Sequence, residues 1–168
     1  MSNTDAVSVT TVVAVDPATA FAAFTEEIEM WWRPRVKRLF RQDRAGVMKF
    51  EPGPGGRLIE VHDDAPGEPF EVGRVLAWVP GQRVMFEWRQ GDFGPNDVTE
   101  VDVRFEAVKN GTRVTLEHRG WDKLPANHPA RHGYTGDAFA SMIGLRWADL
   151  LTALRSHPRN SRQNGARP

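Results

Sequence analysis

The chain contains no cysteine, which excludes a disulfide framework, a thiolate nucleophile and a cysteine zinc site. It has no excess of charge, since 22 basic side chains balance 22 acidic ones, so no general attraction to nucleic acid or to an anionic membrane is expected. No apolar run approaches the roughly 20 residues of a membrane helix, and residues 1–5 lack the features of a signal peptide. These absences predict a cytoplasmic protein, and 168 residues suit a single domain.

The most informative feature that is present is the adjacent pair Trp31 and Trp32. Each indole can bury about 150–250 Å² of surface, so the pair predicts a place where helices close over apolar space. A valine-rich strand over residues 7–15 precedes this region, and Asp16-Pro17 suits the start of a helix that leads up to the tryptophans.

From residue 47 onward the pattern changes to short strands separated by turns. Asn110-Gly111 predicts a tight hairpin, because both central residues of a type I′ turn need a positive φ. The expected strands cover residues 47–50, 57–62, 70–79, 83–89, 99–108 and 112–119.

A long helix is expected over residues 137–155, with Pro158 preventing its continuation. At about 100° per residue, its apolar side chains form one broad stripe. The stripe consists of Phe139, Ile143, Trp147, Leu150, Leu151 and Leu154. Residues 157–168 are expected to form a disordered tail, which leaves residues 1–156 as the domain.

This order of elements predicts an α+β fold: a strand, a helical segment, a run of antiparallel strands and a final long helix. A curved antiparallel sheet has one face to bury, and a helix with one apolar stripe is a suitable partner for it. Wrapping the sheet around the helix leaves an apolar interior that the early helical segment closes at one end.

Several segments between residues 7 and 154 carry a resemblance to known proteins. They are Trp31-Trp32-Arg33-Pro34, Gly55-Gly56-Arg57, Gly73-Arg74-Val75 with Pro80 and Arg83, and residues 112–118. With them the chain resembles the SRPBCC superfamily of START-like proteins and, within it, the activator of heat-shock-protein ATPase homologue-like family. The resemblance implies the helix-grip fold, in which a curved antiparallel sheet wraps around a long C-terminal helix, and it implies no shared catalytic motif.

Two histidines, His128 and His132, stand four residues apart, a spacing that on a helix would suit a zinc site. Pro125 and Pro129 disfavour a regular helix there, so both are expected to be loop histidines. No metal ion and no cofactor is expected.

His118 differs from the other histidines, because strand alternation places it on the inner face of the sheet with Val114 and Leu116. It is either an acid or base in a pocket or a histidine paired for structure with a backbone carbonyl at the rim of the sheet. We favour the second interpretation and keep His118 as the one candidate catalytic residue.

Arg146 lies at the edge of the apolar stripe, about 20° from Phe139 around the helix. Its guanidinium either extends around the helix to water or turns inward to meet an anion. The inward arrangement requires an internal carboxylate such as Glu71 or Glu100, or a ligand that carries one. We expect the guanidinium to reach the mouth of a pocket.

Aromatic side chains ordinarily form the core, but in a helix-grip fold we expect some to line a pocket of about a few hundred Å³. No nucleophile-elbow or phosphate-loop pattern is present. The candidate ligand-binding residues are Trp31, Trp32, Trp78, Trp88, Glu100, His118, Trp121, Tyr134, Phe139 and Arg146.

The sequence therefore predicts a protein that binds a small, mostly hydrophobic molecule in an internal cavity between the sheet and the C-terminal helix. One alternative is an enzyme of the polyketide cyclase or hydrolase kind that uses the same cavity, with His118 as general base. The other is a chaperone ATPase-regulating module, which only the resemblance suggests and which we rank last. No nucleic-acid, membrane or chaperone partner is expected, and a homodimer is left open.

Overall fold

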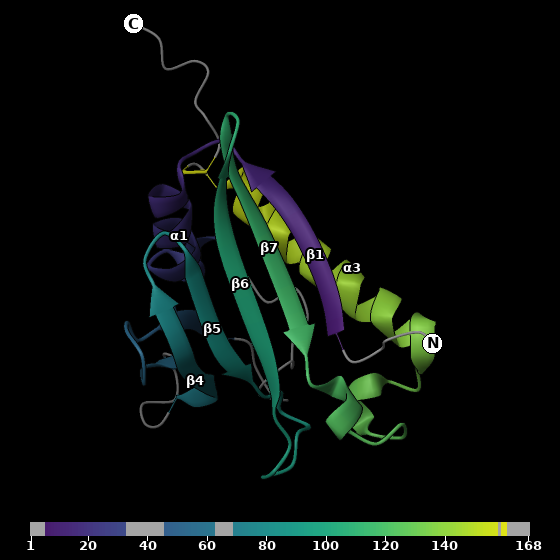
Figure 1. Cartoon of the computed structure of the whole chain (residues 1–168). Coiled ribbons are helices and arrows are strands. Elements are labelled where there is room, and N and C mark those ends of the chain that lie inside the picture. Colours follow the sequence, from purple (N-terminus) through teal and green to yellow (C-terminus); the bar gives the residue numbers. More distant parts are fainter. Residues whose placement is uncertain (1–5, 33–45, 63–68, 158, 161–168) are drawn as a thin grey trace, which may run out of the picture.

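The computed structural model describes residues 6–32, 46–62, 69–157 and 159–160 of the chain. Within these residues the elements follow the expected order (Figure 1). They are β1 Ala6–Val13, α1 Pro17–Thr25, α2 Ile28–Trp31, β2 Val47–Phe50, β3 Arg57–Val61, β4 Phe70–Val79, β5 Arg83–Trp88, β6 Thr99–Val108, β7 Gly111–Arg119, the 3₁₀ turns η1 Trp121–Lys123 and η2 Pro129–Arg131, and α3 Gly136–Ser156.

The described strands form one seven-stranded antiparallel sheet in the order β1-β7-β6-β5-β4-β3-β2. Only β1 departs from sequential order, because it pairs along its length with β7 and places Val9 opposite Leu116. Register shifts in the β3–β4 and β4–β5 pairs mark irregularities of the kind that bend a strand. The curved antiparallel sheet expected from the sequence is confirmed.

The hairpin between β6 and β7 is present, but its turn lies one residue earlier than expected. Val108 pairs with Gly111, so Lys109 and Asn110 are the central residues, and of these two only Asn110 has a positive φ, at 70°. The prediction of a type I′ turn at Asn110-Gly111 is therefore wrong. Gly111 is required for another reason, because a Cβ at this position would lie 2.0 Å from the carbonyl oxygen of Val13 in β1.

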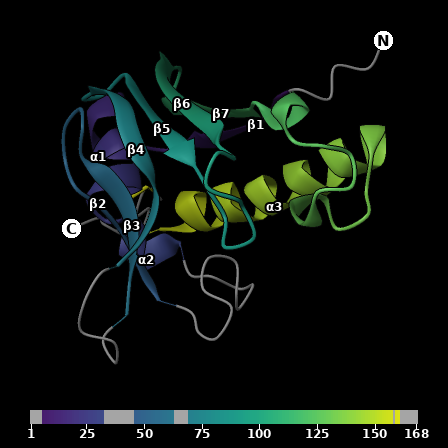
Figure 2. The ribbon, with the colours of Figure 1, turned by 90° about the horizontal axis from the view of Figure 1, so that it is seen from below.

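Helix α3 runs across the concave side of the sheet and lies against β1 (Figure 2). It begins and ends within one residue of the range predicted from its apolar stripe. Five members of that stripe are buried, whereas Leu150 is only half-buried. This arrangement confirms the helix-grip fold. No helix in the described part of the chain is long and apolar enough to cross a membrane.

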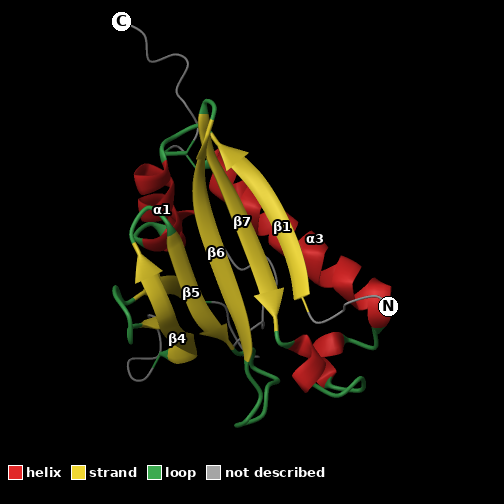
Figure 3. Cartoon of the chain, in the orientation of Figure 1, coloured by secondary structure: helices red, strands yellow, loops and turns green. Residues whose placement is uncertain are grey.

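The helical turns gather at the two ends of α3, with α1 near its C-terminal end and η1 and η2 near its start (Figure 3). The sequence predicts one helix up to the tryptophan pair, but the structure has two, because the helix is interrupted at Glu26 and Glu27 between α1 and α2. The indole nitrogen of Trp31 donates a hydrogen bond of 3.0 Å to the carbonyl of Ala23, which ties α2 to α1.

The residues just after α3 belong to the packed structure. His157 is buried, and its Nε2 lies 2.6 Å from Glu27 Oε1. Asn160 is also buried, and its carbonyl oxygen accepts a hydrogen bond of 3.0 Å from the backbone N–H of Ala14. These contacts correct the expectation that the tail begins at 157, whereas Pro158 and residues 161–168 lie outside the described residues.

Candidate functional site

A cavity of about 40 Å³ lies between α3 and the ends of β5 and β7. Arg146 and Leu150 are its half-buried lining residues and the others are buried, so the cavity faces solvent between these two. The lining residues are Trp88, Gln90, His118, Ile143, Arg146, Trp147 and Leu150.

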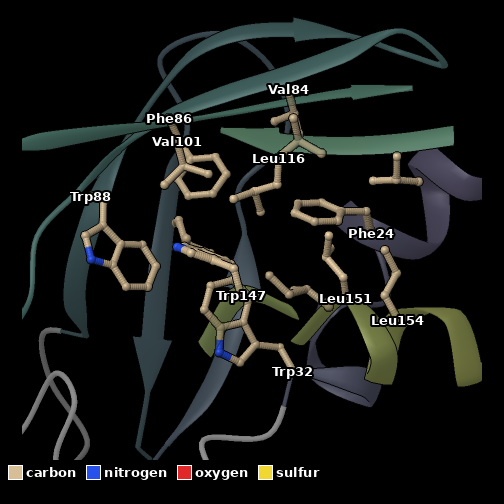
Figure 4. Packing of buried hydrophobic residues seen from close by; sticks show 14 of the residues in the cluster. Phe24, Trp32, Val84, Phe86, Trp88, Val101, Leu116, Trp147, Leu151 and Leu154 are labelled. Atoms are coloured by element: carbon tan, nitrogen blue, oxygen red, sulfur yellow. The ribbon is translucent and has the colours of Figure 1, made fainter. Parts of the chain in front are cut away.

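Three tryptophans from distant parts of the chain meet beside this cavity (Figure 4). Trp32 stacks on Trp88 with 5.7 Å between ring centroids and 18° between ring planes. Trp147 lies 5.2 Å from Trp88 and 5.5 Å from Trp32. Because these rings occupy the interior, the cavity is much smaller than the few hundred Å³ expected from the sequence.

His118 is fully enclosed, and both of its ring nitrogens have partners. The indole Nε1 of Trp147 donates to His118 Nδ1 at 3.0 Å, so Nδ1 carries no proton. The proton is then on Nε2, which donates to Thr99 Oγ1 at 2.7 Å. Thr99 Oγ1 in turn donates to the carbonyl of Trp88 at 3.2 Å. One neutral imidazole thus connects the two tryptophans that line the cavity.

This environment does not suit His118 to acid–base chemistry. Burial lowers the pKa of His118 to about 3. A general base needs a free lone pair and a pKa near the working pH, whereas the Nδ1 lone pair of His118 is already engaged by Trp147. His118 is paired for structure, although its partners are side chains and not the backbone carbonyl expected from the sequence.

Arg146 is one of the residues that line the cavity, and no hydrogen bond or ion pair joins its guanidinium to any residue that the structure describes. Burial lowers the pKa of Arg146, and the negative charge of Asp92 opposes this effect. Neither Glu71 nor Glu100, the internal partners considered from the sequence, pairs with it, because both lie beside arginines of other strands.

Six of the ten residues expected in the ligand site lie at the cavity or directly behind its wall. Those that line it are Trp88, His118 and Arg146. Those behind the wall, each in contact with a lining residue or with one another, are Trp32, Trp121 and Phe139.

The other four expected residues do not line the cavity. Trp31 packs against α1, and Trp78 lies against Phe21 at 5.3 Å, near the other end of the grip. Tyr134 is 47% exposed in the loop before α3. Glu100 alternates with the inward-facing Val101, so its side chain is on the outer face of β6, 3.5 Å from Arg119.

Gln90 is a lining residue that the reasoning from sequence missed. Its Oε1 accepts a hydrogen bond from Trp88 Nε1 at 3.2 Å, and its Nε2 donates to Asp92 Oδ1 at 3.4 Å. The signal was available, because the inward series Val84, Phe86 and Trp88 continues to residue 90 just beyond the end of β5.

The two histidines considered for zinc flank η2 and do not share a helix face. His128 Nε2 lies 2.8 Å from Asp97 Oδ2, and its Nδ1 accepts a hydrogen bond of 3.0 Å from Ala130 N. His132 is exposed and has a φ of 51°. In the described part of the chain, no group of three or more His, Asp or Glu side chains is placed to hold a metal ion.

Comparison with protein families gives a match over most of the chain. The sequence model of the activator of Hsp90 ATPase homolog 1-like proteins matches residues 14–143. The chain belongs to this family. Membership confirms the resemblance noted from the tryptophan pair and the glycine-containing segments. No curated protein matches the chain.

Solved structures resemble this chain along most of its length. Protein NE0264 from Nitrosomonas europaea has a TM-score of 0.60 and 17% identity, covering 92% of this chain and 94% of that one. The Aha1 dimer from Colwellia psychrerythraea has a TM-score of 0.57 and 16% identity, covering 89% and 92%. PFC0360w from Plasmodium falciparum, described as an HSP90 activator, has a TM-score of 0.55 and 21% identity, covering 88% and 91%. At these identities the likeness shows the fold alone.

Proposed function

We propose that this protein binds a small, mostly apolar molecule in the cavity between the sheet and α3. The observation that carries the proposal is the lining of that cavity. Its walls are aromatic and aliphatic, and only a few polar side chains, among them Gln90 and Arg146, meet there. Walls of this composition with a few placed polar groups are typical of small-molecule sites.

The size of the cavity sets a condition on the proposal. A volume of about 40 Å³ is close to that of one water molecule, whereas sites for drug-sized ligands measure about 300–1,000 Å³. The walls must therefore part for a ligand to enter, and the half-buried Arg146 and Leu150 are the side chains that can move most readily. Burial of about 200 Å² of apolar ligand surface would contribute about 5 kcal/mol before the costs of association.

Titration calorimetry with 2-naphthamide, a neutral two-ring probe, tests the proposal. Ile143→Ala removes three carbons from a cavity-lining side chain that is 3% exposed, so it enlarges the cavity. We expect this variant to bind the probe more tightly than the wild type, by roughly threefold or more, because the probe fills space that otherwise stays empty. Leu145→Ala, on the outer face of the same helix at 69% exposure, is the matched control and should leave affinity unchanged.

Binding of the probe should also raise the thermal stability of Ile143→Ala more than that of the wild type. If neither protein binds 2-naphthamide or its carboxylate analogue 2-naphthoate, the proposal is contradicted. An affinity that changes equally in Ile143→Ala and Leu145→Ala also contradicts it, because the probe would then bind outside the cavity.

A second candidate function is regulation of a chaperone ATPase, which the family name and the description of the Plasmodium protein favour. It predicts that the purified chain stimulates ATP hydrolysis by an Hsp90. The enzyme alternative is less well supported, because both ring nitrogens of His118 are engaged. A homodimer and a cytoplasmic location remain part of the proposal, and light scattering and cell fractionation would test them.

A further inference from the structure

Arg146 differs from Arg57, Arg83 and Arg131, which are also buried or half-buried, in the partners of its guanidinium. Arg57 and Arg83 each form two hydrogen bonds to a carboxylate, at 2.8–2.9 Å. Arg131 donates to three backbone carbonyls and lies over the ring of Phe139. Arg146 is half-buried too, yet within the described residues its guanidinium has no such partner. A partly desolvated cation without a partner is unfavourable, so its position at a cavity requires a reason.

The cavity lining carries no negative charge to compensate this cation. None of the lining residues is an aspartate or glutamate. Asp92 acts on Arg146 only through its field, and its Oδ1 accepts a hydrogen bond from Gln90. His118 is neutral, with both ring nitrogens engaged. The five N–H groups of Arg146 are therefore the main polar groups that remain for a ligand.

We infer that the molecule bound in this cavity is an apolar body with one carboxylate or similar oxyanion, and that Arg146 binds the anionic group at the mouth. The inference rests on the proposed function and adds the chemical class of the ligand. An arginine fork can make two parallel hydrogen bonds to a carboxylate, which are stronger than hydrogen bonds between neutral groups. The apolar body would lie between Trp88, Ile143 and Leu150, with its charged end toward solvent.

Asp92 has a definite part in this arrangement. Its charge favours the positive form of Arg146 while the cavity is empty, and it repels an incoming anion. Asp92→Asn should therefore tighten the binding of an anionic ligand and leave that of a neutral ligand unchanged. An increase in affinity is informative, because a general loss of structure would not produce it.

The test compares 2-naphthoate with 2-naphthamide, which have the same shape and differ in charge. Both are titrated calorimetrically into the wild type, Arg146→Gln, Arg146→Lys and Asp92→Asn. Arg155→Gln is the matched control, because Arg155 is on the same helix, is exposed and does not line the cavity. Thermal unfolding of every variant checks that it is folded.

We expect Arg146→Gln to weaken 2-naphthoate at least tenfold and 2-naphthamide less than twofold. Arg146→Lys should keep part of the affinity for the anion, Asp92→Asn should raise it, and Arg155→Gln should have no effect. If both probes bind the wild type and Arg146→Gln weakens them equally, or if Asp92→Asn weakens 2-naphthoate, the inference is overturned while the proposed function stands. If neither probe binds the wild type or Ile143→Ala, the proposed function fails and the inference fails with it.

Discussion

Acidification from about pH 7.5 to about pH 5 should destabilise the protein by about 2 kcal/mol through His118 alone. In the folded state burial holds the pKa of His118 at about 3. In the unfolded chain it returns to its ordinary value of about 6.5. Between these values the unfolded state binds a proton that the folded state does not, so stability falls as the pH falls.

The sign and range of the effect follow from that difference. The contribution of His118 to stability is complete above about pH 6.5 and decreases by at most about 1.4 kcal/mol per pH unit as the pH drops toward 3. Protonation of Nδ1 would also remove the acceptor for the indole of Trp147, 3.0 Å away.

Urea unfolding of the wild type and of His118→Phe at several pH values measures the effect. Groups that titrate in both proteins cancel in the difference between them, provided that they lie far from residue 118. At about pH 7.5 the variant should already be less stable by about 2–4 kcal/mol, because Trp147 Nε1 and Thr99 Oγ1 lose a buried partner. His118→Gln serves the same purpose if the phenylalanine variant does not fold.

Parallel pH profiles of the two proteins would refute the reasoning. His118 would then titrate near its ordinary pKa, and the hydrogen bonds assigned to its ring would be wrong. The interpretation of His118 as a general base would regain support. Nitrogen-15 NMR of the imidazole gives an independent check, because it distinguishes the Nε2-protonated ring from the imidazolium.

Three further variants test how α3 and the outer face of the sheet contribute to stability. Leu151 is 2% exposed, so Leu151→Ala should lower the free energy of unfolding, measured in urea, by about 2–5 kcal/mol. Leu145 is 69% exposed, so Leu145→Ala should lower it by close to nothing. Equal losses in the two variants would contradict the assignment of Leu151 to the buried face of α3. Burial raises the pKa of Asp102, but the hydrogen bonds from Arg83 and the positive charges of Arg83, Arg104 and Arg119 together outweigh burial and hold this pKa below its usual range. Asp102→Asn should thus lower the free energy of unfolding by about 1–3 kcal/mol at neutral pH. This difference from the wild type should shrink below about pH 4, because the carboxyl group of the wild type takes up a proton there. A stability difference that persists in acid would exclude this charge effect.

The elements could be predicted from the sequence because local patterns determine them. The stripe of α3 repeats at the helical period, and five of its six predicted side chains are buried, with Leu150 the half-buried exception. The turn at Asn110 was placed one residue late, because the conformation of a turn depends on the pairing of its strands as well as on its residue types.

The cavity could be predicted only in part, since it depends on contacts between distant segments. Side chains along β6 alternate between the two faces of the sheet, so Glu100 and Val101 point to opposite faces. Consistent use of this pattern would have excluded Glu100 from the candidate ligand site. The same alternation extended past Trp88 would have included Gln90. No pattern in the sequence shows that Trp32 stacks on Trp88, and this contact helps to fill the interior and leave so little space.

The tryptophans also give the protein a built-in optical signal. The indoles of Trp31, Trp32, Trp88 and Trp147 form an unbroken series, with successive ring centroids 5.8, 5.7 and 5.2 Å apart. At such separations their electronic transitions couple, and rings held at fixed angles give exciton bands in circular dichroism. A molecule that enters between Trp88 and Trp147 moves these two rings apart and changes their coupling, while Trp147 still lies 5.5 Å from Trp32. Occupancy of the cavity would therefore change the exciton bands without any attached label.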